Sequence, residues 1–100
     1  MLKHVVMWKL KDKALGNTKL ENALEMKKRL EALHSDIEEI INIEVGINVL
    51  ESEQAFDVVL YAEFEDEKSL EKYQNHPKHL EVGELIKQIR EERVVVDYYK

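Results

Sequence analysis

The amino-acid sequence predicts an α+β protein built from one sheet and a layer of helices. Three stretches with an alternating pattern of apolar and polar residues predict strands at residues 2–10, 41–50 and 56–64, and residues 94–99 predict a last strand. Three stretches with apolar residues at helical spacing lie between them, so the expected order is β-α-β-β-α-α-β. This split βαβ, or ferredoxin-like, order predicts a four-stranded antiparallel sheet with its helices on one face. At 100 residues the chain is long enough for one domain, residues 1–100.

Composition and charge exclude several classes of function. The formal net charge is −6 and no Lys/Arg cluster offsets it, so we expect no binding to nucleic acid or to an anionic membrane surface. Cysteine is absent, which excludes disulfides, thiolate metal sites and a cysteine nucleophile. In residues 1–10 the apolar residues are interrupted by Lys3, His4 and Lys9 and form no continuous apolar core, so we expect neither a signal peptide nor a membrane span. A cytoplasmic location is the expectation consistent with these features.

The first helix begins at a recognisable cap. Thr18 followed by Glu21 forms a capping box, in which each side chain bonds a free backbone N–H of the first turn. An apolar stripe then predicts a helix to about Leu33, carried by Leu20, Ala23, Leu24, Leu30 and Leu33. The segment Ser35–Glu38 predicts a second, short capped turn. The polar segment before the cap, Lys11–Asn17, predicts a loop.

The second and third helices meet at the segment Tyr73–His79, which contains the only proline of the chain. Asp66 is suited to cap the second helix. His76 precedes Pro77 and is therefore restricted to an extended backbone, which ends that helix. The third helix is expected to continue to about Glu92.

The strand faces predict a homodimer. One face of the first strand carries His4, Val6, Trp8 and Leu10 and is expected to meet the helices. The opposite face of the sheet should be polar if it were exposed to water. It is instead expected to hold an apolar patch that a monomer rarely exposes, formed by Val5, Met7, Val59, Tyr61 and Val95. A two-fold dimer that pairs these faces covers the patch. Gly46, beside the patch, predicts a bulge or a close approach.

With these features the chain resembles the stress-responsive A/B barrel family, also called the dimeric α/β barrel (Dabb) family. The similarity spans essentially the whole chain. It is carried by Lys3-His4-Val5-Val6 with Lys9-Leu10-Lys11-Asp12, by Gly46-Ile47-Asn48-Val49, by Tyr73-x-x-His76-Pro77-x-His79 and by Val94-Val95-Val96-Asp97-Tyr98. The resemblance implies a dimeric α+β barrel with helices outside. It does not imply one function, because members include plant stress proteins and a plant polyketide cyclase that closes a ring by aldol condensation.

The resemblance to that cyclase implies a candidate site. A tyrosine and a histidine at the positions of Tyr73 and His79 are its catalytic pair, and a histidine at the position of His4 lines the same pocket. A neutral imidazole suits the base that removes a C–H proton next to a carbonyl, and a phenol suits the donor to the developing oxyanion. Further positions expected to contact a ligand are Trp8, His76, Met26 and Val58, the last two standing where the cyclase carries a tyrosine and a histidine.

Structural interpretations of the same residues remain open. His79 can bond local backbone near its helix start, Tyr73 can be a core residue, and His4 can be a buried histidine bonded to a carbonyl. A metal site at His76 and His79 lacks helical spacing and a third ligand, so we expect no metal and no cofactor.

Two functional classes follow from these features. One is a protein that binds a small carbonyl-containing or apolar ligand between sheet and helices. The other is a cofactor-independent enzyme, either a cyclase or lyase of aldol type or a monooxygenase, that uses the histidine–tyrosine pair.

Overall fold

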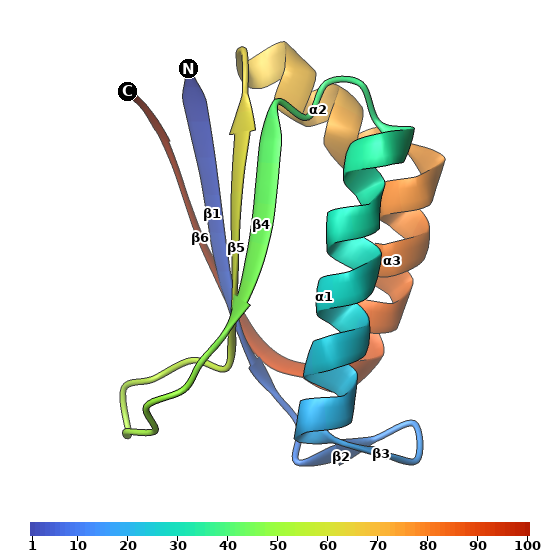
Figure 1. The fold of residues 1–100 in the computed structure, drawn as a ribbon, viewed down its shortest axis with the longest axis vertical. Coiled ribbons are helices and arrows are strands. Elements are labelled where there is room, and N and C mark those ends of the chain that lie inside the picture. Colours follow the sequence, from blue (N-terminus) through green and yellow to red (C-terminus); the bar gives the residue numbers. More distant parts are fainter.

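The computed structural model describes residues 1–100 as a four-stranded antiparallel sheet with helices on one face (Figure 1). The strand order is β4-β5-β1-β6. The strands are β1 (Leu2–Leu10), β4 (Asn42–Ile47), β5 (Val58–Phe64) and β6 (Arg90–Tyr99). The helices are α1 (Lys19–Asp36), α2 (Glu67–Asn75) and α3 (Pro77–Ile89). The predicted ferredoxin-like α+β fold is confirmed.

The hydrophobic core fills the space between this sheet and the helices. The predicted inward face of β1 is buried, as is that of β5, whose inward residues are Val58, Leu60, Ala62 and Phe64. The helices supply the other half of the core, through residues that include Ala23, Met26, Leu30, Leu33, Leu70, Tyr73, Val82, Ile86 and Ile89. No helix of the chain combines the length and apolar character needed to cross a membrane.

Helix α1 is longer than predicted. Its capping box at Thr18 and Glu21 is present, with the Thr18 Oγ1 accepting from the Glu21 N–H at 3.2 Å. The predicted second turn at Ser35–Glu38 is wrong, because the helix continues to Asp36 and ends on Ile37, whose buried side chain extends the inward stripe. The inward assignment of Leu20 and Leu24 is also wrong, and both side chains are exposed. Leu24 is separated from inward Met26 by about 200° around the helix.

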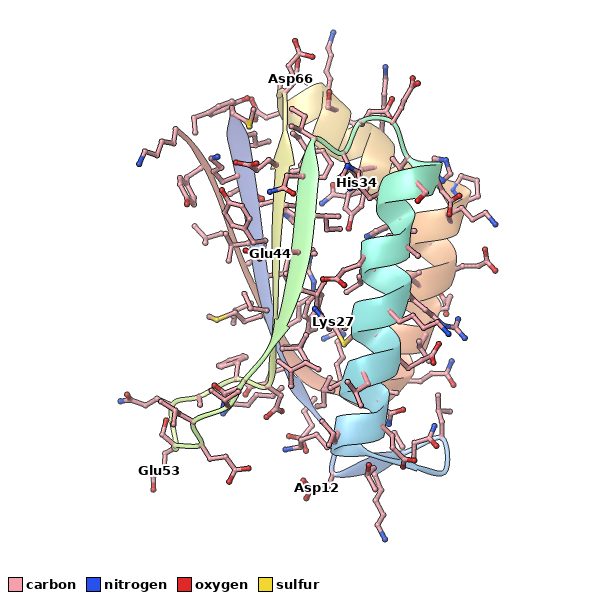
Figure 2. The ribbon with its side chains drawn as sticks, viewed as in Figure 1. Asp12, Lys27, His34, Glu44, Glu53 and Asp66 are labelled. Atoms are coloured by element: carbon pink, nitrogen blue, oxygen red, sulfur yellow. The ribbon has the colours of Figure 1, made fainter.

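Helix α1 also holds the edge strand β4 (Figure 2). Lys27 reaches from the helix toward the sheet, where its Nζ donates to the Val45 carbonyl at 2.5 Å. Glu31, one turn later, pairs with Lys27 at 2.9 Å and accepts from the Val45 N–H at 3.0 Å. These contacts satisfy backbone groups that an edge strand otherwise leaves unpaired.

Local turns differ from the prediction in three places. The expected loop before α1 contains a small hairpin, β2 (Lys13–Ala14) and β3 (Asn17–Thr18), joined by a turn in which Leu15 and Gly16 both have positive φ. Gly46 forms no bulge, since β4 pairs with β5 in unbroken register; a side chain there would crowd Val59, whose Cγ1 lies 3.2 Å from the Cβ position. Helix α3 ends at Ile89, three residues early, and the chain enters β6 at once.

The register of β6 corrects one predicted contact. Residues directly opposite each other in an antiparallel pair share a face. Val95 lies opposite Val6, on the helix-facing side, so its assignment to the outward face is wrong. Val94 and Val96, opposite Met7 and Val5, lie outward instead. We call the resulting surface the outer sheet face; its apolar residues are Val5, Met7, Val59, Tyr61, Val94, Val96 and Tyr98.

Candidate functional site

The joint between α2 and α3 brings Tyr73 and His79 together. Pro77 holds His76 extended, with φ −65° and ψ 135°, so this residue ends α2 and begins α3. The His76 Nδ1 accepts from the Lys78 N–H at 3.1 Å and caps the new helix. Tyr73 lies in the last turn of α2 and His79 in the first turn of α3. Their ring centroids are therefore only 4.4 Å apart.

A cavity of about 280 Å³ lies between β1, α3 and the start of β6, and His4, Tyr73 and His79 all line it. The ring centroids of His4 and Tyr73 are 6.3 Å apart, and the Phe64 ring packs against both. The remaining lining residues are mostly apolar or cationic: Val6, Trp8, Leu30, Leu60, Gly83, Ile86, Lys87, Arg90 and Arg93. A larger groove of about 520 Å³ contains no histidine, tyrosine or tryptophan, and its polar walls offer no comparable chemistry.

His79 is held as a neutral imidazole with one free nitrogen. Its Nδ1 lies 3.1 Å from the Gln74 carbonyl oxygen. A carbonyl only accepts, so Nδ1 carries the proton, and in the neutral ring Nε2 keeps its lone pair. Burial lowers the pKa of His79 below its ordinary value of 6.5, and the nearby positive charge of Arg93 acts in the same direction. His79 therefore has the protonation state that a general base requires near neutral pH.

Tyr73 and Trp8 carry buried donors without partners. The Tyr73 hydroxyl and the Trp8 Nε1 both lack a hydrogen bond, although neither atom reaches solvent. Burial raises the pKa of Tyr73, so its phenol remains protonated. A hydrogen bond from this phenol to an acceptor would therefore be stabilising. Buried polar groups in native proteins are almost always paired, and both of these side chains line the same cavity. A ligand acceptor that reached either donor would satisfy it.

His4 is oriented by a carboxylate that sequence reasoning did not identify. Asp97 lies opposite His4 in the pairing of β1 with β6, and its Oδ1 is 2.5 Å from the His4 Nδ1. The carboxylate accepts, so the His4 Nδ1 carries a proton and the ring is fixed in one orientation. The acceptor for His4 is therefore the Asp97 side chain on the neighbouring strand, in place of the backbone carbonyl that was one expected partner.

Comparison with known proteins identifies the family. The model of the stress responsive A/B barrel domain matches residues 2–100. The chain belongs to this family. A dimeric ferredoxin-like protein of unknown function from Bacteroides fragilis is 34% identical, with a TM-score of 0.85 over 97% of this chain and 93% of that one.

More distant structures share the fold. A protein from Arabidopsis thaliana is 24% identical, with a TM-score of 0.84 over 100% of this chain and 95% of its own. Hydroxynitrile lyase from Passiflora edulis is 15% identical, with a TM-score of 0.81 over 97% and 90% of the two chains. No curated protein matches the sequence.

Of the four further candidate residues, the structure places three outside the cavity lining and one within it. Met26 and Val58 are fully enclosed in the core, and neither borders the cavity. His76 serves the helix cap described above and also lies outside the lining. Trp8 does line the cavity. No three His, Cys, Asp or Glu side chains gather closely enough to hold a metal ion.

Three cationic residues at the cavity were not predicted. Lys87 lies in the last turn of α3, Arg90 caps the C-terminal end of that helix, and Arg93 lies on β6 opposite Trp8. Sequence reasoning missed Arg90 because it continued α3 to about Glu92, and it gave Lys87 and Arg93 no role in a site. The available signal was the alternation of Arg93, Val95 and Asp97 on one face of the last strand.

The lowered pKa of His79 predicts a pH dependence of stability. In the unfolded chain His79 binds a proton near its ordinary pKa of 6.5, whereas the folded chain resists protonation until a lower pH. The unfolded state therefore binds more protons below about pH 6.5, and stability falls as the pH drops through this range. We expect His79→Gln to remove this component of a urea-unfolding series between pH 8 and 5. A histidine NMR titration with a His79 midpoint above 6.5 would contradict the assignment.

Proposed function

We propose that this chain binds a small carbonyl-containing ligand in the cavity, with the Tyr73 hydroxyl donating to the carbonyl oxygen. The observation that carries the proposal is the buried Tyr73 hydroxyl without a partner. An unpaired buried hydroxyl destabilises a protein by about 1–3 kcal/mol, and a ligand acceptor would satisfy it. Trp8 offers a second unpaired donor in the same space. The apolar walls suit the hydrocarbon part of such a ligand.

The second candidate function is cofactor-independent proton abstraction, and the free Nε2 of His79 favours it. In such a reaction the C–H bond next to the ligand carbonyl breaks and its proton passes to Nε2. The electron pair forms the enolate, whose oxygen Tyr73 stabilises by its hydrogen bond. The enolate carbon can then attack a second carbonyl, as in an aldol cyclisation, and the resulting alkoxide takes the proton back from the His79 imidazolium; alternatively the imidazolium returns the proton to the enolate carbon. The likeness to hydroxynitrile lyase shows the fold alone and does not select this chemistry.

We also infer that the chain acts as a homodimer through the outer sheet face. The face places Met7, Val94, Val96 and Tyr98 in exposed positions around half-buried Val5, Val59 and Tyr61. A contiguous apolar surface of this kind is typical of an interface. The relative from Bacteroides fragilis, at 34% identity, is described as dimeric and supports the inference. The cavity opens on the opposite side of the sheet, so two copies would carry two separate cavities.

Tyr73→Phe tests the binding proposal, because it removes only the hydroxyl. We expect this variant to bind butyrophenone, a neutral phenyl ketone, about fivefold more weakly, since it loses one neutral hydrogen bond. We also expect its free energy of unfolding to rise by about 1 kcal/mol, because the buried hydroxyl without a hydrogen-bond partner is removed. Trp8 is the only tryptophan, so its indole N–H resonance and fluorescence report on the cavity directly.

The matched control is Tyr99→Phe, which removes an exposed hydroxyl 3.4 Å from Glu67 and away from the cavity. It should change neither the affinity nor the stability by a measurable amount. If Tyr73→Phe binds butyrophenone as tightly as the wild type, the hydroxyl makes no bond to the carbonyl and Tyr73 is a core residue only.

A further inference from the structure

Three cationic residues of the cavity lining have little or no neutralisation by carboxylates. They are Lys87, Arg90 and Arg93, of which Lys87 and Arg93 are exposed. No ion pair of the chain includes Arg90 or Arg93. Lys87 meets Glu84 at 3.4 Å in a contact exposed to solvent, which holds it weakly.

The absence of a counter-ion is notable in an acidic chain. Acidic residues outnumber basic ones, 21 to 15, and two glutamates lie between the arginines in sequence. Neither of these glutamates forms an ion pair with Arg90 or Arg93. Glu92 pairs with Lys9 at 3.5 Å, and Glu91 borders the separate polar groove. Strand alternation and the turn out of α3 therefore leave Arg90 and Arg93 beside the cavity without a carboxylate.

The positions of the polar groups divide the cavity into two ends. Tyr73 and His79 lie at the helix joint, and Arg90 and Arg93 lie where α3 passes into β6. The buried Trp8 side chain is directly opposite Arg93 in the strand pairing, and its Nε1 has no partner. Val6, Leu60 and Ile86 supply apolar wall along the cavity. A ligand that satisfies every group needs a carbonyl at one end, an apolar middle and an anion at the other end.

We propose that the cavity binds a small oxo carboxylic acid, with Arg93 and Arg90 holding its carboxylate while its ketone meets Tyr73. The guanidinium fork matches a planar carboxylate in geometry and donates two parallel hydrogen bonds. The Trp8 Nε1 adds a donor next to Arg93. This inference rests on the proposed carbonyl-binding function and adds the chemical class of the ligand.

The same geometry couples the two ends of the cavity. Burial is the main cause of the lowered pKa of His79, and the positive charge of Arg93 makes a smaller contribution in the same direction. A carboxylate bound at Arg93 neutralises that charge, so the pKa of His79 rises when the ligand is present. An acid ligand therefore strengthens the base that faces its own ketone.

The test compares two ligands that differ only at one end. Butyrophenone and 3-benzoylpropionate share the phenyl ketone, and the second carries a carboxylate in place of the terminal methyl group. Both are titrated into the full-length protein at low ionic strength, with Trp8 fluorescence and the indole N–H resonance as readouts. We expect the wild type to bind 3-benzoylpropionate at least tenfold more tightly than butyrophenone, and addition of salt to reduce this preference.

Arg93→Gln is expected to abolish the preference for the acid, measured as the ratio of the affinities for 3-benzoylpropionate and butyrophenone. The chain offers a matched control in Arg29, the one arginine that lies outside the cavity lining, which pairs with Glu25 on α1. Arg29→Gln should keep the full preference. Circular dichroism of each variant checks that the fold is intact.

The outcomes separate this inference from the function on which it rests. Equal binding of the two ligands, or an acid preference that survives Arg93→Gln, overturns the carboxylate site even where Tyr73→Phe weakens butyrophenone binding. Acid binding that depends on Arg93 but not on Tyr73 supports the carboxylate site and overturns the carbonyl-binding function. Binding of neither ligand contradicts both.

Discussion

Replacing Val96 with aspartate is expected to convert the homodimer into monomers. Val96 lies on the outer sheet face, opposite Val5 in the β1–β6 pairing. In a dimer that pairs these faces, the new carboxylate would be buried against apolar side chains without a partner, which costs several kcal/mol per ion. The two-fold axis places this cost on both subunits at once. Val59→Glu, at the centre of the face on β5, should act in the same way.

The adjacent valine provides the control. Val95→Asp introduces the same charge one residue earlier, at a position of similar exposure, 48% against 55% for Val96. Val95 points to the helix side of the sheet and is expected to leave the dimer intact. Sedimentation velocity at micromolar concentration distinguishes the three proteins. A monomeric wild type, or dissociation by both aspartate variants, would show that the outer sheet face is not the interface.

The strand faces could be predicted where buried and more exposed positions alternate along the strand. They could not be predicted where several apolar residues follow one another. In β1 and β5 every second residue is buried, so the apolar pattern alone assigned the inward and outward positions correctly. In β6 three valines follow one another, Val94, Val95 and Val96, and a run of this kind is compatible with either register. Only the pairing with β1 decides which valines face outward.

Helix boundaries were predictable from local chemistry where no long-range contact competed. The capping box at Thr18 and the proline at position 77 act within one turn, and both features are present as expected. The Ser35 signal failed because Ile37 lies one turn beyond Leu33 and gains more from burial in the core than a new cap would provide. Tertiary packing therefore determined the length of α1.

The site was partly predictable for the same reason. Tyr73 and His79 are close in sequence, and the extended His76 brings their rings together by a local rule. Asp97 is separated from its partner His4 by 93 residues, and Arg93 from Trp8 by a similar distance. Such contacts depend on the register of the first and last strands. Alternation indicates the face on which a residue lies but not its register against another strand, so the pairing of Asp97 with His4 and of Arg93 with Trp8 could be found only in the folded structure.

Phe64→Ala is expected to cause a large decrease in the free energy of unfolding. The Phe64 side chain is 0% exposed at the end of β5. Its ring centroid lies 5.0 Å from that of Tyr73 and 6.3 Å from that of His4, so it supports two side chains of the cavity. Truncating a buried phenylalanine costs about 3–5 kcal/mol, because the transfer free energy is lost and a cavity remains. This is a large part of the ordinary stability of a domain, about 5–15 kcal/mol.

The chain contains one other phenylalanine, which serves as the control. Phe56 is half-buried before β5, where the Lys9 Nζ lies 5.1 Å from its ring centroid. Phe56→Ala should cost about 1 kcal/mol, the typical loss for a substitution outside the core. Urea unfolding must compare all variants at one protein concentration, because the stability of a dimer depends on it. Equal losses for the two variants would show that Phe64 does not anchor the cavity. A larger loss at Phe64, with shifted ring resonances of His4 and Tyr73, would show that one core side chain sets the geometry of the site.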